Sequence, residues 1–233
     1  MLTRNKIIEA IEKSLKDSKE QRREHLLFGR IFVYVKDELI QGVSISKVIQ
    51  EIEKSIPPYM MEEVDEILIG YFDENSDREL EAHFDSGAIY VSNLLPTEKD
   101  FIENIVHETS HALESQHGLY IYGDKKIEHE FLGKRRRLKE ILKSHDYPVQ
   151  SIDFENLDYS EEFDNLLYKE IGYPALSNLA LGLFVSPYAI TSLREYWAVG
   201  FEDYFIGDRG YLQKISQQLF MKIMEIENDI GEM

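Results

Sequence analysis

The strongest constraint on the fold of this chain is the segment IVHETSHALE, residues 105–114, in which His107 and His111 stand four residues apart. In an α-helix this spacing puts the two side chains about 40° apart around the axis and one turn apart along it. The two imidazoles can therefore share one metal ion if the segment is helical. Apolar residues around the motif favour a packed helix here: Phe101, Ile105, Val106, Ala112 and Leu113.

The available ligand types narrow the metal chemistry. The chain contains no cysteine, so disulfides and thiolate sites are excluded, and any metal must be bound by His, Asp or Glu. Zinc accepts imidazole nitrogens readily, and Glu108, next to the first histidine, stands where it can take a proton from a zinc-activated water. We predict one Zn²⁺ per chain, with His107 and His111 as ligands and Glu108 as catalytic base. The alternative is an ordinary helix that carries two unrelated histidines.

A third protein ligand has two candidates. His117 stands where the pattern HExxHxxGxxH puts a third histidine, but Glu114 replaces the glycine, and on a continued helix His117 points about 120° away from His111. Glu195 begins a second predicted helix, and a downstream glutamate completes the site in gluzincins. However, Ser192 to Glu195 also fits a capping box, in which the glutamate would only satisfy a backbone amide.

The motif HETSH, Tyr188 and the segment from Glu195 to Ala198 together resemble the catalytic domain of anthrax lethal factor and its relatives, the Pro-Pro endopeptidases, over about residues 89–226. The resemblance implies a gluzincin-type zinc metallopeptidase, with Glu195 as the third zinc ligand and Tyr188 as hydrogen-bond donor to the oxyanion. The family segment continues with a second acidic residue where this chain has Val199. We expect Glu202 or Asp203 to supply that carboxylate.

Charge and hydropathy limit partners and location. The formal net charge of -18 argues against a nucleic-acid partner, because phosphates would be repelled. The N-terminal residues lack the apolar stretch of a secretory signal, so we expect a cytoplasmic protein without a membrane span. The uncharged segment 171–193 is interrupted by prolines and is predicted to form a buried core helix and a loop. The basic cluster 134–139 is predicted to line a solvated helix face between residues 124 and 144.

Periodicity predicts an α+β protein with a zincin-like metallopeptidase domain, residues 61–233, and a helical N-terminal lobe, residues 1–60. We expect N-terminal helices at residues 2–16, 22–40 and after Ser44. A small mixed sheet is predicted from strand-like segments 64–72, 79–85 and 88–91, and Thr97 with Asp100 marks the start of the motif helix. Strand 88–91 is a candidate for pairing with an extended substrate.

The function that these predictions favour is hydrolysis of peptide bonds in a peptide or protein substrate by a zinc endopeptidase. Two alternatives stay open at this point. A zinc hydrolase for a small amide would keep the same ligands but have a narrow pocket. A catalytically silent binding module would keep the zincin fold without turnover.

Overall fold

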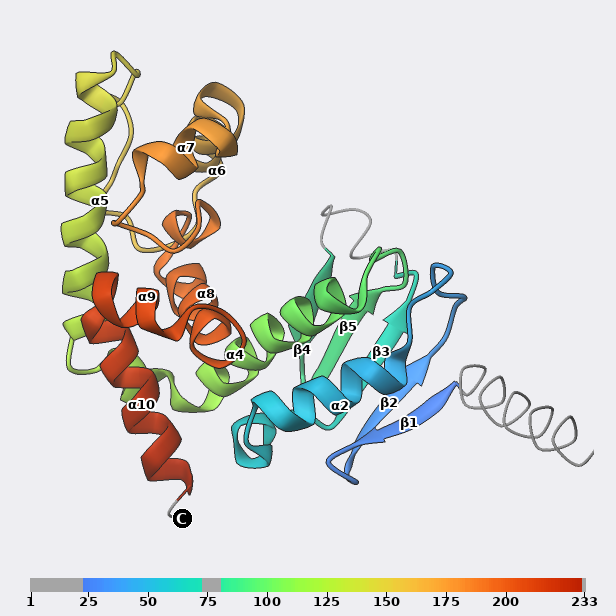
Figure 1. Ribbon diagram of the computed structural model, residues 1–233. Coiled ribbons are helices and arrows are strands. Elements are labelled where there is room, and N and C mark those ends of the chain that lie inside the picture. Colours follow the sequence, from blue (N-terminus) through green and yellow to red (C-terminus); the bar gives the residue numbers. More distant parts are fainter. Residues whose placement is uncertain (1–22, 73–80, 232–233) are drawn as a thin grey trace, which may run out of the picture. The chain divides into compact units, whose positions relative to one another are not determined.

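The computed structural model describes residues 23–72 and 81–231 of the chain. The chain divides into two units, Met1–Thr109 and Ser110–Met233. Helix α4, Glu98–Tyr122, runs through the boundary between them and carries the histidine motif (Figure 1).

A mixed sheet forms the first unit, with strand order β1-β2-β3-β5-β4. The outer pairs, β1 with β2 and β4 with β5, are antiparallel, and β3 is parallel to both of its neighbours. The strands are β1 Glu24–Leu27, β2 Ile31–Val35, β3 Glu66–Gly70, β4 Ala82–Asp85 and β5 Ala88–Ser92. The predicted α+β class is confirmed, and so are the three predicted strands in their described parts.

One face of this sheet is covered by helix α2, Ile45–Ser55, and by the first turns of α4 (Figure 1). Helix α2 turns four apolar residues inward: Ile45, Val48, Ile49 and Ile52. Strand β2 alternates with period two, because Ile31, Val33 and Val35 are buried while Phe32, on the other face, is 66% exposed. A 3₁₀ turn, η1 Pro58–Met61, leads from α2 towards β3.

The N-terminal prediction needs correction. The predicted helix 22–40 is wrong, because β1 and β2 form an antiparallel hairpin whose turn has Phe28 and Gly29 at positive φ. The hairpin is held to α2 by the Phe28 amide, which donates to Glu53 Oε1 at 2.8 Å. The helix expected after Ser44 is confirmed as α2, and the one expected at 2–16 lies outside the described residues. Strand β2 precedes the predicted domain boundary at residue 60 and β3 follows it. Since these two strands pair, the residues on both sides of that boundary belong to one sheet.

The prediction that strand 88–91 receives the substrate is also wrong. Strand β5 lies between β3 and β4 and is hydrogen-bonded on both sides. Among the strands of the described residues, β1 and β4 lie at the two edges of the sheet. An added peptide strand therefore requires one of these edges, and β4 is the one that pairs with β5 directly before the motif helix.

The second unit is helical in its described part. Its main elements are α8 Leu193–Phe205 and the helices that pack near it, α5 Lys126–Ser144 and α10 Gln217–Gly231. Helices α8 and α10 approach closely at Gly200, where a Cβ atom would lie 2.3 Å from Leu219 Cδ2. Shorter elements complete the unit: α6 Glu161–Asn165, η2 Leu166–Ile171, α7 Tyr173–Leu179, η3 Tyr188–Ile190 and α9 Arg209–Ile215.

The uncharged segment 171–193 does not form the predicted buried core helix. Helix α7 buries only Leu176 in the segment 173–179, and Leu181 beyond it is 76% exposed. A helix this short cannot turn a whole apolar face into the core. Some apolar residues of the segment are therefore buried, and others are exposed to solvent. Within the described residues, no helix has the length and apolar character that crossing a membrane requires.

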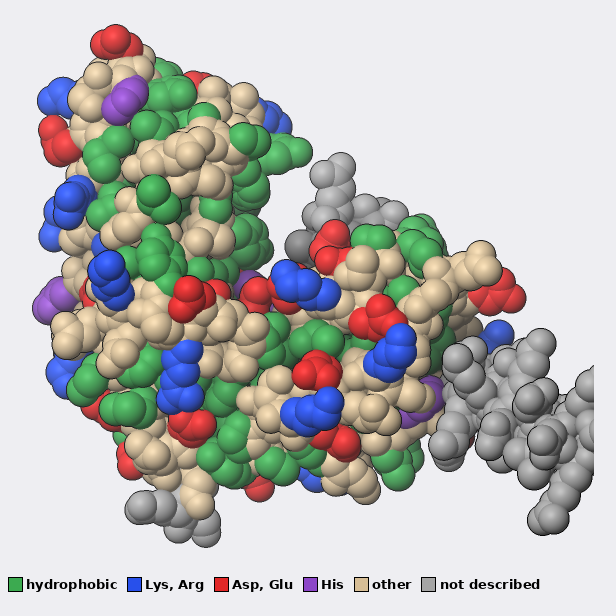
Figure 2. All heavy atoms as spheres, in the orientation of Figure 1, with side chains coloured by type: hydrophobic (Ala, Val, Ile, Leu, Met, Phe, Trp, Pro, Cys, Tyr) green, Lys and Arg blue, Asp and Glu red, His purple; other side chains and the backbone are tan. Residues whose placement is uncertain are grey.

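The basic cluster on α5 is the clearest departure from the predicted solvated face. Lys134 and Arg135 are buried, whereas Arg136 is exposed and pairs with Glu155. Basic and acidic side chains are interspersed on the visible surface of this unit (Figure 2). The guanidinium of Arg135 lies over the rings of Phe131 and Phe163 and donates to backbone carbonyls, so it is part of the core.

Candidate metal centre

The phase of the motif helix is set at its first turn. The amide of Thr97 donates to Asp100 Oδ2 at 2.9 Å, and the amide of Asp100 donates to Thr97 Oγ1 at 3.2 Å. This is the predicted reciprocal capping box, and it satisfies amides that an uncapped helix would leave without partners. Because α4 then continues without a break to Tyr122, His107 and His111 stand one turn apart on one helix face.

Helix α4 brings His107, Glu108 and His111 together. One ligand atom from each lies within 4.8 Å of the others. Glu108 is 8% exposed and His111 is 5% exposed, while His107 is half-buried. Polar groups this well buried need partners, and two imidazoles beside a carboxylate offer the donor types that zinc binds.

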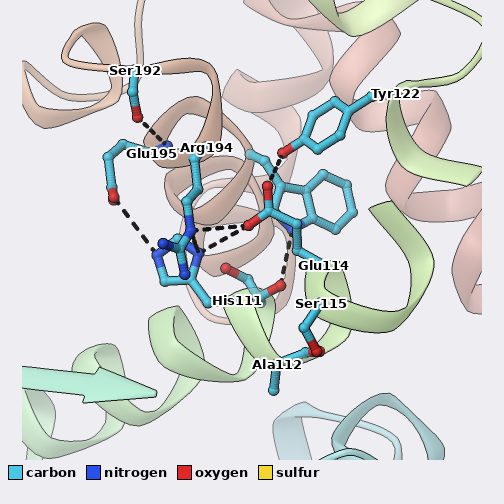
Figure 3. Close-up of polar contacts among 10 residues, drawn as sticks. His111, Ala112, Glu114, Ser115, Tyr122, Ser192, Arg194 and Glu195 are labelled. Carbon is cyan, nitrogen blue, oxygen red and sulfur yellow. Dashed lines mark hydrogen bonds and ion pairs between the residues drawn. The ribbon is translucent and has the colours of Figure 1, made fainter. Parts of the chain in front are cut away.

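Glu195 approaches His111 from helix α8. Its Oε1 lies 3.7 Å from His111 Nε2 (Figure 3). At the same helix start, the Glu195 amide donates to Ser192 Oγ at 3.1 Å. The serine half of the predicted capping box therefore forms, while the Glu195 carboxylate faces His111. The cap uses only the backbone of Glu195, so its side chain is left to face His111.

Two aromatic residues after Glu195 hold α8 in place. Trp197 is fully buried, and its indole Nε1 donates to the carbonyl of Ser110, one residue before His111, at 3.2 Å. The hydroxyl of Tyr196 donates to Glu130 Oε1 at 2.9 Å, and burial raises the pKa of Tyr196 well above its usual value. These bonds fix the start of α8 relative to His111, which keeps the Glu195 carboxylate on the Nε2 side of the ring.

The other ring nitrogen of His111 faces Glu114. Nδ1 lies 3.4 Å from Glu114 Oε2, and the same oxygen accepts from Arg194 Nε at 3.1 Å (Figure 3). Glu114 Oε1 accepts from the Tyr122 hydroxyl at 2.6 Å. Burial, followed by the charge of Glu114, raises the pKa of Tyr122, which therefore stays a hydrogen-bond donor.

Glu114 thus supplies the second carboxylate at His111 that we expected from Glu202 or Asp203. Ligating histidines ordinarily donate their other ring nitrogen to such a group. The sequence did carry a signal for it, because a residue three positions after His111 on a helix lies on the same side. Asp203 instead has a buried Oδ2 for which the described part of the chain offers no hydrogen-bond partner.

The remaining predicted residues lie as follows. His117 is half-buried on α4, and since the helix continues to Tyr122, its side chain points about 120° away from that of His111. It is therefore a helix residue outside the His107–His111 face. Tyr188 lies in η3, before the start of α8, and its side chain is 41% exposed. Its role as an oxyanion donor stays a prediction.

Imidazole nitrogens and carboxylate oxygens are donor types that zinc binds. In a tetrahedral shell with bonds of about 2.0–2.2 Å, neighbouring ligand atoms lie roughly 3.3–3.6 Å apart. The 3.7 Å separation of His111 Nε2 and Glu195 Oε1 is close to that value. Comparison of the chain with protein families, curated proteins and solved structures gave no match. Function is therefore inferred from the geometry and chemistry of these residues.

Proposed function

We propose that the protein is a zinc-dependent endopeptidase with a zincin-like fold, in which His107, His111 and Glu195 hold the metal. The observation that carries this proposal is the 3.7 Å approach of Glu195 Oε1 to His111 Nε2. A shared ion would account for this approach of two residues that lie far apart in the sequence. A bound zinc ion would polarise the substrate carbonyl and lower the pKa of a water molecule towards about 7.

Two protein side chains are proposed to assist the reaction, one by proton transfer and one by hydrogen bonding. Glu108 is buried on the same helix as the two histidines. In this proposal it takes a proton from the attacking water and returns it to the leaving amine. Tyr188 donates a hydrogen bond to the carbonyl oxygen as negative charge develops there. Donors of this kind contribute about 3 kcal/mol to transition-state stabilisation.

The edge strand β4 is the proposed place for the substrate backbone. Glu81, the residue before β4, accepts a hydrogen bond from Asn104 on α4 at 3.3 Å, one turn before the motif. An extended peptide that pairs with β4 would therefore lie beside the start of the motif helix and gain main-chain hydrogen bonds independent of its sequence. Strand addition of this kind suits a peptide substrate better than a small amide.

The test is digestion of a peptide library by the purified protein, with cleavage sites read by mass spectrometry. We expect cleavage that a chelator abolishes and added zinc restores. Glu108→Gln should retain zinc and lose at least about a hundredfold in rate, since only the proton acceptor is removed. Glu103→Gln is the matched control on the same helix, because it removes only the surface pair with Lys99.

The outcomes separate the alternatives. Turnover of small amides with no peptide cleavage would replace the endopeptidase proposal with the small-amide hydrolase. If the protein binds one zinc ion but turns over neither substrate, the catalytically silent binding module would replace the endopeptidase proposal. Full activity of Glu108→Gln would show that Glu108 is not the base.

A further inference from the structure

His111 Nδ1 lies between a donor and an acceptor. Arg194 Nε is 3.1 Å from it, and Glu114 Oε2 is 3.4 Å from it (Figure 3). A neutral imidazole carries one ring proton, so these two contacts correspond to different tautomers. With the proton on Nδ1, the ring donates to Glu114 and the lone pair of Nε2 is available on the side of Glu195. With the proton on Nε2, Nδ1 accepts from Arg194, and Nε2 cannot bind a metal.

The surrounding bonds favour the first tautomer. Arg194 Nε has a second acceptor at the same 3.1 Å distance, Glu114 Oε2, so its N–H is satisfied without using Nδ1. The other carboxylate oxygen of Glu114 is held by the Tyr122 hydroxyl at 2.6 Å. Glu114 is therefore fixed from two sides as an acceptor, and an N–H on Nδ1 adds a third donor to it. Arg194 in this arrangement orients the carboxylate and does not compete for the ring.

We propose that Glu114, held by Tyr122 and Arg194, is a positioning residue that keeps His111 in the Nδ1-protonated tautomer and so frees Nε2 for the metal. This inference rests on the proposed function, because it takes His111 as a metal ligand. Hydrogen-bond partners of ligating histidines commonly change metal affinity by about 10–100-fold. Loss of the Glu114 carboxylate should lower zinc affinity within that range.

The first measurement is zinc affinity, determined by competition with a chromophoric chelator. We expect Glu114→Gln to bind zinc at least about tenfold more weakly than the wild-type protein. Tyr122→Phe should show a smaller loss, since Arg194 still holds the carboxylate. Glu103→Gln, the same substitution at a half-buried position of α4 that pairs with Lys99, should match the wild type. Equal affinities of Glu114→Gln and Glu103→Gln would overturn the role of Glu114.

The second measurement does not require a folded variant. Long-range ¹H–¹⁵N spectra of the metal-free wild-type protein, with His111 assigned and its ring neutral, report which nitrogen carries the proton. We expect Nδ1–H, and a majority of Nε2–H would overturn the proposal. The proposed function fails separately: if the wild type binds no zinc, the metal centre is refuted, whereas wild-type zinc binding that is insensitive to Glu114 refutes only this inference.

Discussion

Replacing Arg135 with leucine should destabilise the second unit more than any exposed substitution on α5. The Arg135 side chain is fully buried, and its guanidinium donates to the carbonyls of Ile190, Thr191 and Asn156. Two of these carbonyls lie between Tyr188 and Glu195 in the sequence. The same side chain therefore stabilises the core and orders the segment that leads into α8.

The magnitude follows from the groups left behind. Each of the two buried carbonyls, those of Ile190 and Thr191, costs about 1–3 kcal/mol when it loses its donor. The half-buried carbonyl of Asn156 costs less, because water can reach it. Part of this cost is offset, because the substitution also removes a cation whose burial is unfavourable. Burial of the guanidinium lowers the pKa of Arg135 to about 10. Breaking a buried charged network typically costs about 3–5 kcal/mol, and we expect a loss of about 4 kcal/mol in the free energy of unfolding.

Urea denaturation followed by tryptophan fluorescence measures this directly. Trp197 is the only tryptophan and lies in the second unit, so its emission reports on that unit. Arg136→Leu is the matched control, since Arg136 is exposed and its pair with Glu155 is screened by solvent. A loss below about 1 kcal/mol for Arg135→Leu, or equal midpoints for the two variants, would refute the role assigned to Arg135.

Two further substitutions test packing and electrostatics on α8. Gly200→Ala should cost about 1–2 kcal/mol by urea denaturation despite its higher helix propensity, because the new methyl meets the fully buried Leu219; unchanged stability would show that α10 can yield. Burial raises the pKa of Asp203 from 3.8 to about 6, so the folded state holds more protons across that window and stability falls as pH rises through it. Asp203→Asn should therefore be more stable than the wild type at pH 7 but not below about pH 4. A stability difference between the two proteins that does not change with pH would contradict the effect assigned to ionisation of Asp203.

Local signals made part of the fold predictable. The strands β3, β4 and β5 show alternation or apolar runs between turn residues, and the capping box at Thr97 and Asp100 needs only residues close in sequence. The β1–β2 hairpin was missed because Phe32, on its exposed face, is as apolar as its buried neighbours, so hydropathy hides the alternation. Its turn also lacks the Asn-Gly or Asp-Gly pair typical of two-residue hairpins.

The candidate site was predictable to the extent that helix geometry determines it. The spacing of His107 and His111 required one helix face, and the continuation of α4 moves His117 off that face. The approach of Glu195 depends on how α8 packs, which no local pattern in the sequence specifies. The burial of Arg135 was missed for a similar reason. Charged residues are ordinarily exposed, and the carbonyl groups that pair with this guanidinium come from a distant segment of the sequence.

Zinc titration of two variants tests the central claim most directly. The wild-type protein should bind close to one zinc per chain. Glu195→Gln should bind it much more weakly, because a neutral amide oxygen replaces a carboxylate that faces the cation. His117→Ala should retain wild-type affinity, since this side chain points away from the shared face of His107 and His111. The reverse order, with His117 essential and Glu195 dispensable, would contradict the three-ligand site proposed for this chain.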